Sequence, residues 1–261
     1  MSPILEARGI SKNFGAVTAA KDVNVAISQD EVVGIIGANG AGKTTFVNMV
    51  TGYLKPTSGQ IVFEGRDITQ LEPRQITRLG ICRSFQVPQV FMTETVYENL
   101  LTALGIAAAT GFSVLRYMKR PDLETQCEAL LTRYGIGDYR DHLASSLPQG
   151  VRKLLDIAMA MVARPRILLL DEPTSGISTD EKFGLMDTVM SALREEKVTV
   201  LFVEHDMEIV ERYVGRVLAF YQGEIICDAP PAEALVDPKV KEFVIGEEHH
   251  RRDDAEGNAD A

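Results

Sequence analysis

GANGAGKTT, residues 37–45, follows the apolar run VVGII and leads into the helical pattern of FVNMVTGYL. It matches G-x-x-x-x-G-K-[ST], a spacing that forms a phosphate-binding loop when a strand precedes it and a helix follows. Gly37, Gly40 and Gly42 let the backbone point its N–H groups inward, and the helix N-terminus adds a favourable partial charge. The stretch therefore predicts an α/β core with a phosphate site. A glycine-rich turn without function is the alternative.

Two further side chains of this loop and one apolar strand complete the expected chemistry. Lys43 is predicted to reach the β- and γ-phosphates, and the Thr44 hydroxyl to ligate Mg²⁺. Downstream, ILLLDE at residues 167–172 reads as a buried strand with Asp171 at its carboxyl end, where ligands bind in open α/β sheets. Asp171 is then expected to hold Mg²⁺ through water, and Glu172 to activate the attacking water. The alternative is that Asp171 and Glu172 form an exposed turn before a proline and have no catalytic role.

The distance between these motifs predicts the domain organisation. Lys43 and Asp171 lie 128 positions apart (171 minus 43), more than a minimal nucleotide fold needs. Short strand patterns fill the first part of the chain, and the pattern becomes mainly helical from about Val96 to Val162. We therefore expect a phosphate-binding core with a β subdomain at 1–88 and 163–240, an inserted helical subdomain at 89–162, and a C-terminal end with an acidic, disordered tail at 241–261.

Composition bounds the class of protein. The 261 residues carry a net charge of -10, which argues against a general nucleic-acid binder. Three cysteines without a CxxC pair suggest neither a disulfide framework nor a zinc site. The N-terminus lacks an apolar signal core, and no apolar run reaches the about 18–20 residues that span a bilayer. We expect a protein that works at a membrane only through another chain.

Five further features occur in a known order along the chain. Phe14 stands in SKNFGAVTA, Gln86 in RSFQVPQVF and His205 in VEHDM, while LPQGV occupies 147–151 and SGIS occupies 175–178. Together with the two motifs above, they resemble the nucleotide-binding subunit of an ABC transporter over roughly residues 3–240. Alone, Phe14 would be read as core and His205 as structural. The resemblance implies a P-loop NTPase (ABC ATPase) core with an antiparallel β subdomain and an inserted α-helical subdomain.

The resemblance also implies a role for each site residue, with ATP and Mg²⁺ as cofactors. Phe14 matches the aromatic residue that stacks on adenine, and His205 the switch histidine that contacts the γ-phosphate. Gln86 matches the glutamine that links the Mg²⁺ site to the helical subdomain. The predicted catalytic residues are Glu172, His205 and Gln86; the metal site is Thr44, Gln86 and Asp171; the ATP-binding residues are Phe14, Gly37, Asn39, Gly40, Gly42, Lys43, Thr44 and Thr45.

The segment Leu147–Val151, called the signature segment here, departs from the family's usual LSGGQ. In the family, ATP lies between the phosphate loop of one subunit and the signature of the other. Here the serine is Pro148, which lacks a hydroxyl and an amide donor, the first glycine is Gln149, and the final glutamine is Val151. Only Leu147 and Gly150 match the usual LSGGQ. The hypothesis is a heterodimer with unequal ATP sites; alternatively, Gln149 and the helix dipole suffice for closure.

The D-loop, Ser175–Ser178, also departs from the family, because Ser178 replaces its aspartate and Asp180 follows two residues later. The long entry to the helical subdomain and the early C-terminus resemble the ATPases of branched-chain amino acid type uptake systems. The resemblance implies an importer subunit peripheral to the cytoplasmic face of the inner membrane. Its partners would be a second ATPase, transmembrane permease subunits and, indirectly, a periplasmic or surface solute-binding protein, with no nucleic acid.

Three alternatives remain. One is a homodimeric ATPase of another ABC transporter, such as one moving lipid or lipopolysaccharide, although those usually keep a good signature. A second is a non-transport ABC protein of translation or DNA repair, which would need two cassettes or a long coiled coil. The third is a regulatory module that binds ATP without hydrolysis, which Glu172 and His205 argue against.

Overall fold

The structure is a computed structural model that describes residues 3–84, 89–108 and 121–246. It divides into two compact units, Met1–Leu79 with Thr199–Ala261, and Gly80–Val198. The expected boundaries at 88 and 162 remain a prediction. Gln86 and the tail at 247–261 lie outside the described residues.

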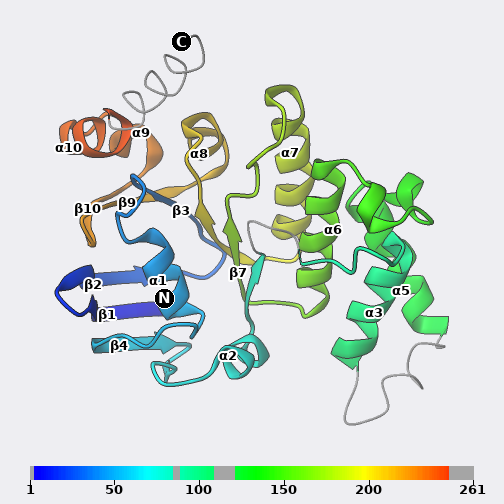
Figure 1. The fold of residues 1–261 in the computed structure, drawn as a ribbon, viewed down its shortest axis with the longest axis horizontal. Coiled ribbons are helices and arrows are strands. Elements are labelled where there is room, and N and C mark those ends of the chain that lie inside the picture. The colour runs from blue at the N-terminus through cyan, green and yellow to red at the C-terminus, as the bar shows by residue number, and fades with distance from the viewer. Residues whose placement is uncertain (1–2, 85–88, 109–120, 247–261) are drawn as a thin grey trace. The chain divides into compact units, whose positions relative to one another are not determined.

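The first unit contains a four-stranded antiparallel sheet in the order β2-β1-β4-β5 (Figure 1). Its strands are β1 Leu5–Phe14, β2 Val17–Ile27, β4 Ser58–Phe63 and β5 Arg66–Asp67. Glu64 and Gly65 form the turn between β4 and β5, both with positive φ (48° and 77°), the backbone that a two-residue hairpin turn requires. The antiparallel β subdomain expected from the sequence is confirmed.

The same unit carries the strands of the nucleotide-binding core. β3 Val32–Ile36 runs parallel to both β8 Thr199–Val203 and β9 Arg216–Tyr221, and β10 Glu224–Ala229 closes a hairpin with β9. β3, β8 and the middle of β9 read as continuous apolar runs because they are buried on both faces. The helices of this unit are α1 Lys43–Val50, α2 Pro73–Leu79, α8 Met207–Tyr213, α9 Pro231–Ala234 and α10 Pro238–Val240, followed by a π-helical turn, Lys241–Ile245.

The second unit is mainly helical, as the sequence predicts. Two parallel strands, β6 Ile81–Ser84 and β7 Ile167–Asp171, pair with each other. The long helices are α3 Val96–Ala108, α5 Pro121–Arg133, α6 Gln149–Val162 and α7 Thr179–Glu195, with 3-10 turns at Gly137–Tyr139 and Ala144–Ser146. α7 has Asp180 and Glu181 in its first turn and Arg194 in its last. These charges interact favourably with the helix dipole.

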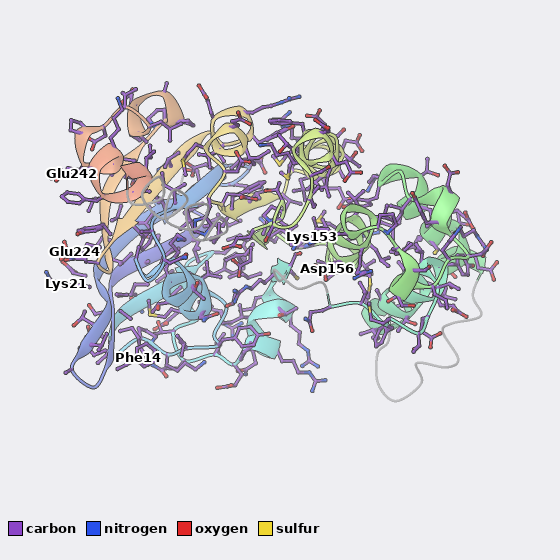
Figure 2. The ribbon with its side chains drawn as sticks, turned by 45° about the horizontal axis from the view of Figure 1, so that its top comes forward. Phe14, Lys21, Lys153, Asp156, Glu224 and Glu242 are labelled. Atoms are coloured by element: carbon purple, nitrogen blue, oxygen red, sulfur yellow. The ribbon has the colours of Figure 1, made fainter. Side chains whose placement is uncertain are left out.

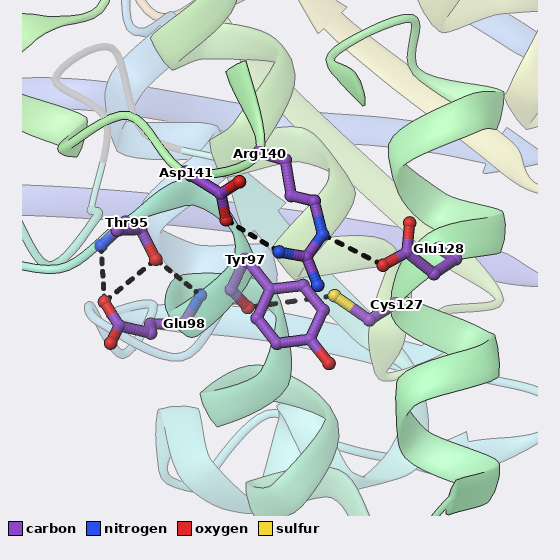
Figure 3. Close-up of polar contacts among 7 residues, drawn as sticks. All are labelled: Thr95, Tyr97, Glu98, Cys127, Glu128, Arg140 and Asp141. Carbon is purple, nitrogen blue, oxygen red and sulfur yellow. Dashed lines mark hydrogen bonds and ion pairs between the residues drawn. The ribbon is translucent and has the colours of Figure 1, made fainter. Parts of the chain in front are cut away.

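Local hydrogen bonds fix the entry to α3 (Figure 3). Thr95 and Glu98 form a capping box: the Thr95 N–H donates to Glu98 at 2.8 Å, and the Glu98 N–H donates to the Thr95 hydroxyl at 3.2 Å. The Arg140 guanidinium lies 4.0 Å from the centre of the Tyr97 ring and pairs with Glu128. These contacts join the 3-10 turn region to α3 and α5.

No helix of the described residues is long and apolar enough to cross a membrane. Two of the cysteines, Cys82 and Cys127, are buried free thiols, and burial raises their pKa to about 11 and about 12. A thiol held protonated in this way is a poor nucleophile and a poor metal ligand.

Candidate functional site

The phosphate loop lies between the carboxyl end of β3 and the first turn of α1. Gly37 and Gly42 have φ of 151° and 108°. A Cβ at Gly37 would lie 2.5 Å from the Phe220 carbonyl oxygen, and one at Gly42 would lie 2.6 Å from the Ala19 carbonyl oxygen. Both positions therefore need glycine for two reasons, the dihedral angle and the close approach of another backbone.

Lys43 is the charged group of this loop. Its side chain is only 6% exposed, and its ammonium donates to the carbonyls of Gly37 and Ala38, the latter at 3.1 Å. Asn39, Gly40 and Thr44 are exposed. A buried cation at a helix N-terminus, inside a loop whose rim faces solvent, is the electrostatic setting that an anion such as a phosphate needs.

The core of α1 holds the loop in place. Phe46 is fully buried, and its ring centre lies 5.5 Å from that of Phe220 on β9. The Gly223 N–H donates to the Ala41 carbonyl at 2.9 Å, which ties the loop to the β9–β10 turn. The loop is therefore preorganised by packing that the G-x-x-x-x-G-K-[ST] pattern alone does not reveal.

His205 follows β8, the strand next to β3. Ile35 pairs with Val203, so the phosphate loop and His205 leave the carboxyl ends of adjacent parallel strands. Glu204 is 3% exposed, its N–H donates to the Ile35 carbonyl at 3.4 Å, and its carboxylate accepts from the His205 N–H at 3.2 Å. Sequence reasoning missed Glu204; a charged residue directly after a fully buried strand was the available signal.

Phe14 lies at the end of β1, labelled in Figure 2. Its side chain is 49% exposed, and the Lys12 ammonium lies 5.3 Å from the ring centre. A half-exposed aromatic ring is not a core residue, so the alternative that Phe14 only packs in the core is wrong. An exposed ring face is what stacking on a base requires.

In the second unit, Asp171 ends β7 and forms an ion pair with Arg83 of the neighbouring strand β6. Arg83 is largely buried, at 8% side-chain exposure, and Asp171 is 16% exposed. Sequence reasoning did not single out Arg83, because its partner comes from a strand 88 positions away in the chain. The pair places a cation against the carboxylate that is predicted to hold Mg²⁺.

Glu172 has φ of 45°, a left-handed backbone that a residue with a Cβ adopts at a cost of about 1 kcal/mol or more. The turn that follows is closed by the Ser175 N–H, which donates to the Glu172 carbonyl at 3.1 Å. Such conformations persist where surrounding contacts determine them. This hydrogen bond joins the Glu172 carbonyl to the first residue of the D-loop.

The signature segment begins α6. Pro148 is the N-cap of this helix, with φ of −53° and ψ of 151°, and no side chain caps the helix. The extended ψ keeps Pro148 outside the first helical turn. Leu147 is buried, whereas Pro148 and Gln149 are exposed and Gly150 is half-buried.

Two polar residues on the buried face of α6 were also missed. Asp156 is 6% exposed and accepts from the Ser84 hydroxyl and, at 2.8 Å, from the Gln89 N–H, while burial raises its pKa. Lys153, one turn earlier, is buried beside it (Figure 2). The tertiary contacts with residues 84 and 89 explain why a carboxylate lies on this buried face.

A model of the ABC transporter family matches residues 20–175. The chain belongs to this family. It is 36% identical over 253 residues to the high-affinity branched-chain amino acid transport ATP-binding protein LivG of Escherichia coli, covering 94% of this chain and 98% of that one. It is 34% identical over 251 residues to BraF of Pseudomonas aeruginosa, a protein of the same description, with the same two coverages.

Solved ABC structures share the fold. A crystal structure of an ATP-binding cassette of an ABC transporter in its ADP conformation superposes with a TM-score of 0.80 at 31% identity, covering 93% of this chain and 98% of that one. A nucleotide-free cassette gives 0.79 at 32% identity with the same coverages. The predicted ABC ATPase fold is confirmed, and the chain is an ABC transporter ATPase subunit.

Proposed function

We propose that this chain is the ATP-binding and ATP-hydrolysing subunit of an ABC importer for a small polar solute, such as a branched-chain amino acid. The phosphate loop carries the proposal: glycines where only glycine fits, and a buried Lys43 at a helix N-terminus. The solute class is supported by the branched-chain amino acid transport named for LivG and BraF. The chain would sit at the cytoplasmic face of the membrane, bound to permease subunits, with a solute-binding protein acting indirectly.

In the proposed site, backbone N–H groups of the phosphate loop, Lys43 and Thr45 bind the phosphates of ATP, and Phe14 stacks on adenine. The exposed Phe14 ring and the turned loop support these roles. Lys43 would exchange its loop carbonyls for phosphate oxygens, which are stronger acceptors for an ammonium. Asn39, Gly40 and Thr44 lie on the exposed rim of the loop, where a nucleotide approaches.

A magnesium ion fits the donors that the chain offers. The Thr44 hydroxyl, the Asp171 carboxylate and Gln86 would hold it; oxygen donors suit Mg²⁺, which keeps several waters and binds with substrate phosphates. When bound, it neutralises charge on the β- and γ-phosphates. Arg83 would then have to share Asp171 with that site, since the two residues form an ion pair here.

Hydrolysis would use Glu172 as the general base, taking a proton from the water that attacks the γ-phosphorus. His205 would donate to the γ-phosphate, where charge develops as ADP leaves. The adjacent ends of β3 and β8 support the pairing of His205 with the phosphate loop.

The partner is proposed to be a second, different ATPase. In the signature segment Pro148 offers neither a hydroxyl nor an N–H, and no side chain caps α6. A phosphate on the partner's nucleotide would therefore meet fewer donors here than at a helix with a serine cap. The chain's own phosphate loop is complete, so the two ATP sites of such a pair would be unequal.

Glu172→Gln tests the catalytic part. Turnover by the assembled transporter should fall by about 100-fold or more, because the base is lost, while the affinity of this chain for ATP stays within about threefold. Full activity in this variant would put the base elsewhere. Loss of labelled leucine, isoleucine and valine uptake in cells lacking the chain, restored by wild type and not by the variant, tests the solute class; normal uptake of all three would contradict it.

A further inference from the structure

Gln149, the third residue of the signature segment, contacts the D-loop of its own chain. Its side-chain amide donates to the Ser175 carbonyl at 2.9 Å, across 26 positions of sequence. The same amide packs against Gly176, the residue after Ser175, because a Cβ at Gly176 would overlap it. Both residues are exposed, so the contact lies on the surface of the second unit.

The D-loop in turn is hydrogen bonded to Glu172. Ser175 offers its carbonyl to Gln149, and its N–H donates to the Glu172 carbonyl at 3.1 Å. A second turn follows at once, closed by the Ile177 N–H on the Thr174 carbonyl at 3.1 Å. Two consecutive hydrogen bonds therefore lead from the Gln149 side chain to the backbone of Glu172, whose φ is 45°.

The donor is held at a fixed place. Arg152, one turn along α6, donates to the carbonyls of Ala144 at 3.2 Å and Leu147 at 2.9 Å, which ties the start of the helix to the segment before it. Asp156 anchors the next turn on Ser84 and Gln89. Because α6 is held in this way, the Gln149 amide acts on the D-loop from a rigid support.

We propose that Gln149 is a positioning residue for Glu172: it ties the D-loop to the N-terminus of α6 and so fixes the turn that carries the catalytic base. The proposal rests on the proposed function in one respect, that Glu172 is the base. A glycine at position 149 has no side chain and makes no such bond. Compared with a glycine, Gln149 would keep the partner's nucleotide further from the backbone of α6. In return, its side chain binds the D-loop of its own chain.

Hydrogen exchange on the purified chain tests the contact. Gln149→Met keeps the size and helix propensity of the side chain and removes the donor. Gln149→Lys keeps a donor, and Gln126→Met is the matched control, because Gln126 is another exposed glutamine whose amide donates to a backbone carbonyl, that of Asp122 at 3.2 Å. Amides of Ser175–Ser178 should exchange roughly threefold faster or more in Gln149→Met, near wild type in Gln149→Lys, and unchanged in the control. Equal exchange in Gln149→Met and wild type would overturn the proposal.

Steady-state kinetics test the positioning role. In the assembled transporter, Gln149→Met should lower the kcat for ATP hydrolysis several-fold while KM stays within about twofold, since the phosphate loop is untouched. Gln149→Lys should recover much of the loss. Faster exchange with an unchanged kcat would overturn the link to Glu172. Failure of the proposed function is distinguishable, because it shows as no ATP turnover by the wild-type transporter and leaves the exchange result standing.

A double-mutant cycle provides a second test that needs no nucleotide. Gly176→Ala should lower Tm by about 2–4 °C in the wild type, from its φ of 74° and from overlap with the Gln149 amide. In a Gln149→Gly background the drop should be smaller, because only the dihedral cost remains. An equal drop in both backgrounds would contradict the contact.

Discussion

The phosphate loop and the signature segment are both helix N-termini that the family uses on ATP, yet this chain builds them differently. At α1 the backbone turns through Gly37 and Gly42, and Lys43 supplies a buried cation. At α6 the turn begins with Pro148, and the side chain of Gln149 is bound to the D-loop. One terminus is shaped to receive an anion, and the other is largely engaged within its own unit.

The difference teaches that a helix N-terminus is not in itself an anion site. The partial charge is common to both helices, but only α1 of the two follows a glycine turn that encloses a buried lysine ammonium. In the signature segment, proline removes one donor. The contrast predicts that binding and hydrolysis depend on this chain's own loop, and assembly on the other chain's signature.

Lys43→Ala should have the largest effect. Removing charge-assisted hydrogen bonds to the phosphates costs about 3 kcal/mol, or roughly 100-fold in ATP affinity. Titration with a fluorescent ATP analogue measures it, and Lys239→Ala, at an exposed position on α10, is a control for general loss of positive charge. Unchanged ATP affinity in Lys43→Ala would contradict the claim that the phosphate loop binds the phosphates of ATP.

Gly42→Ala should come next. The new Cβ would lie 2.6 Å from the Ala19 carbonyl at a φ of 108°, so strain and overlap together cost about 2–3 kcal/mol of unfolding free energy. Gly65→Ala is the matched control, because its φ is 77° and nothing lies within 4 Å of its Cβ. Urea unfolding of both variants should show the larger loss at position 42; equal losses would mean that the loop is not tightly packed.

Asp156→Asn should change how the unfolding free energy depends on pH, which tests the burial of Asp156 on α6. Burial raises the pKa of Asp156, so the folded state holds the proton more tightly than the unfolded state. As pH rises from below the ordinary carboxyl pKa of about 3.9, the wild type should lose unfolding free energy relative to Asp156→Asn. Urea midpoints at pH 4 and 7 measure this, with exposed Asp138→Asn as control. A pH-independent difference would show that Asp156 does not titrate in a buried site.

Pro148→Ser should have the smallest effect on stability. A serine N-cap adds about 1 kcal/mol, while losing proline frees the unfolded chain by about 0.4–1 kcal/mol, so the two nearly cancel. Combined with Gln149→Gly, however, it should strengthen ATP-dependent self-association, measured by light scattering. No gain in self-association would mean that the signature segment is not what limits it.

The sequence predicted the α/β core from the phosphate-loop pattern, and the early strands and the mainly helical middle of the chain from local periodicity. The phosphate loop could be predicted because its chemistry lies within nine consecutive residues, 37–45. Arg83, Glu204 and the Gln149–Ser175 contact could not, because each joins strands or turns that only the folded chain brings together. Asp156 interrupts an apolar face for the same reason.

The most direct test of the account is the mass in solution of purified Glu172→Gln, by light scattering with and without ATP, in buffer with EDTA. The account predicts a monomer that binds ATP and doubles its mass only when a second ATPase with an intact signature is added. An ATP-driven doubling of this chain alone would contradict it, because the segment Leu147–Val151 would then close on ATP without another signature.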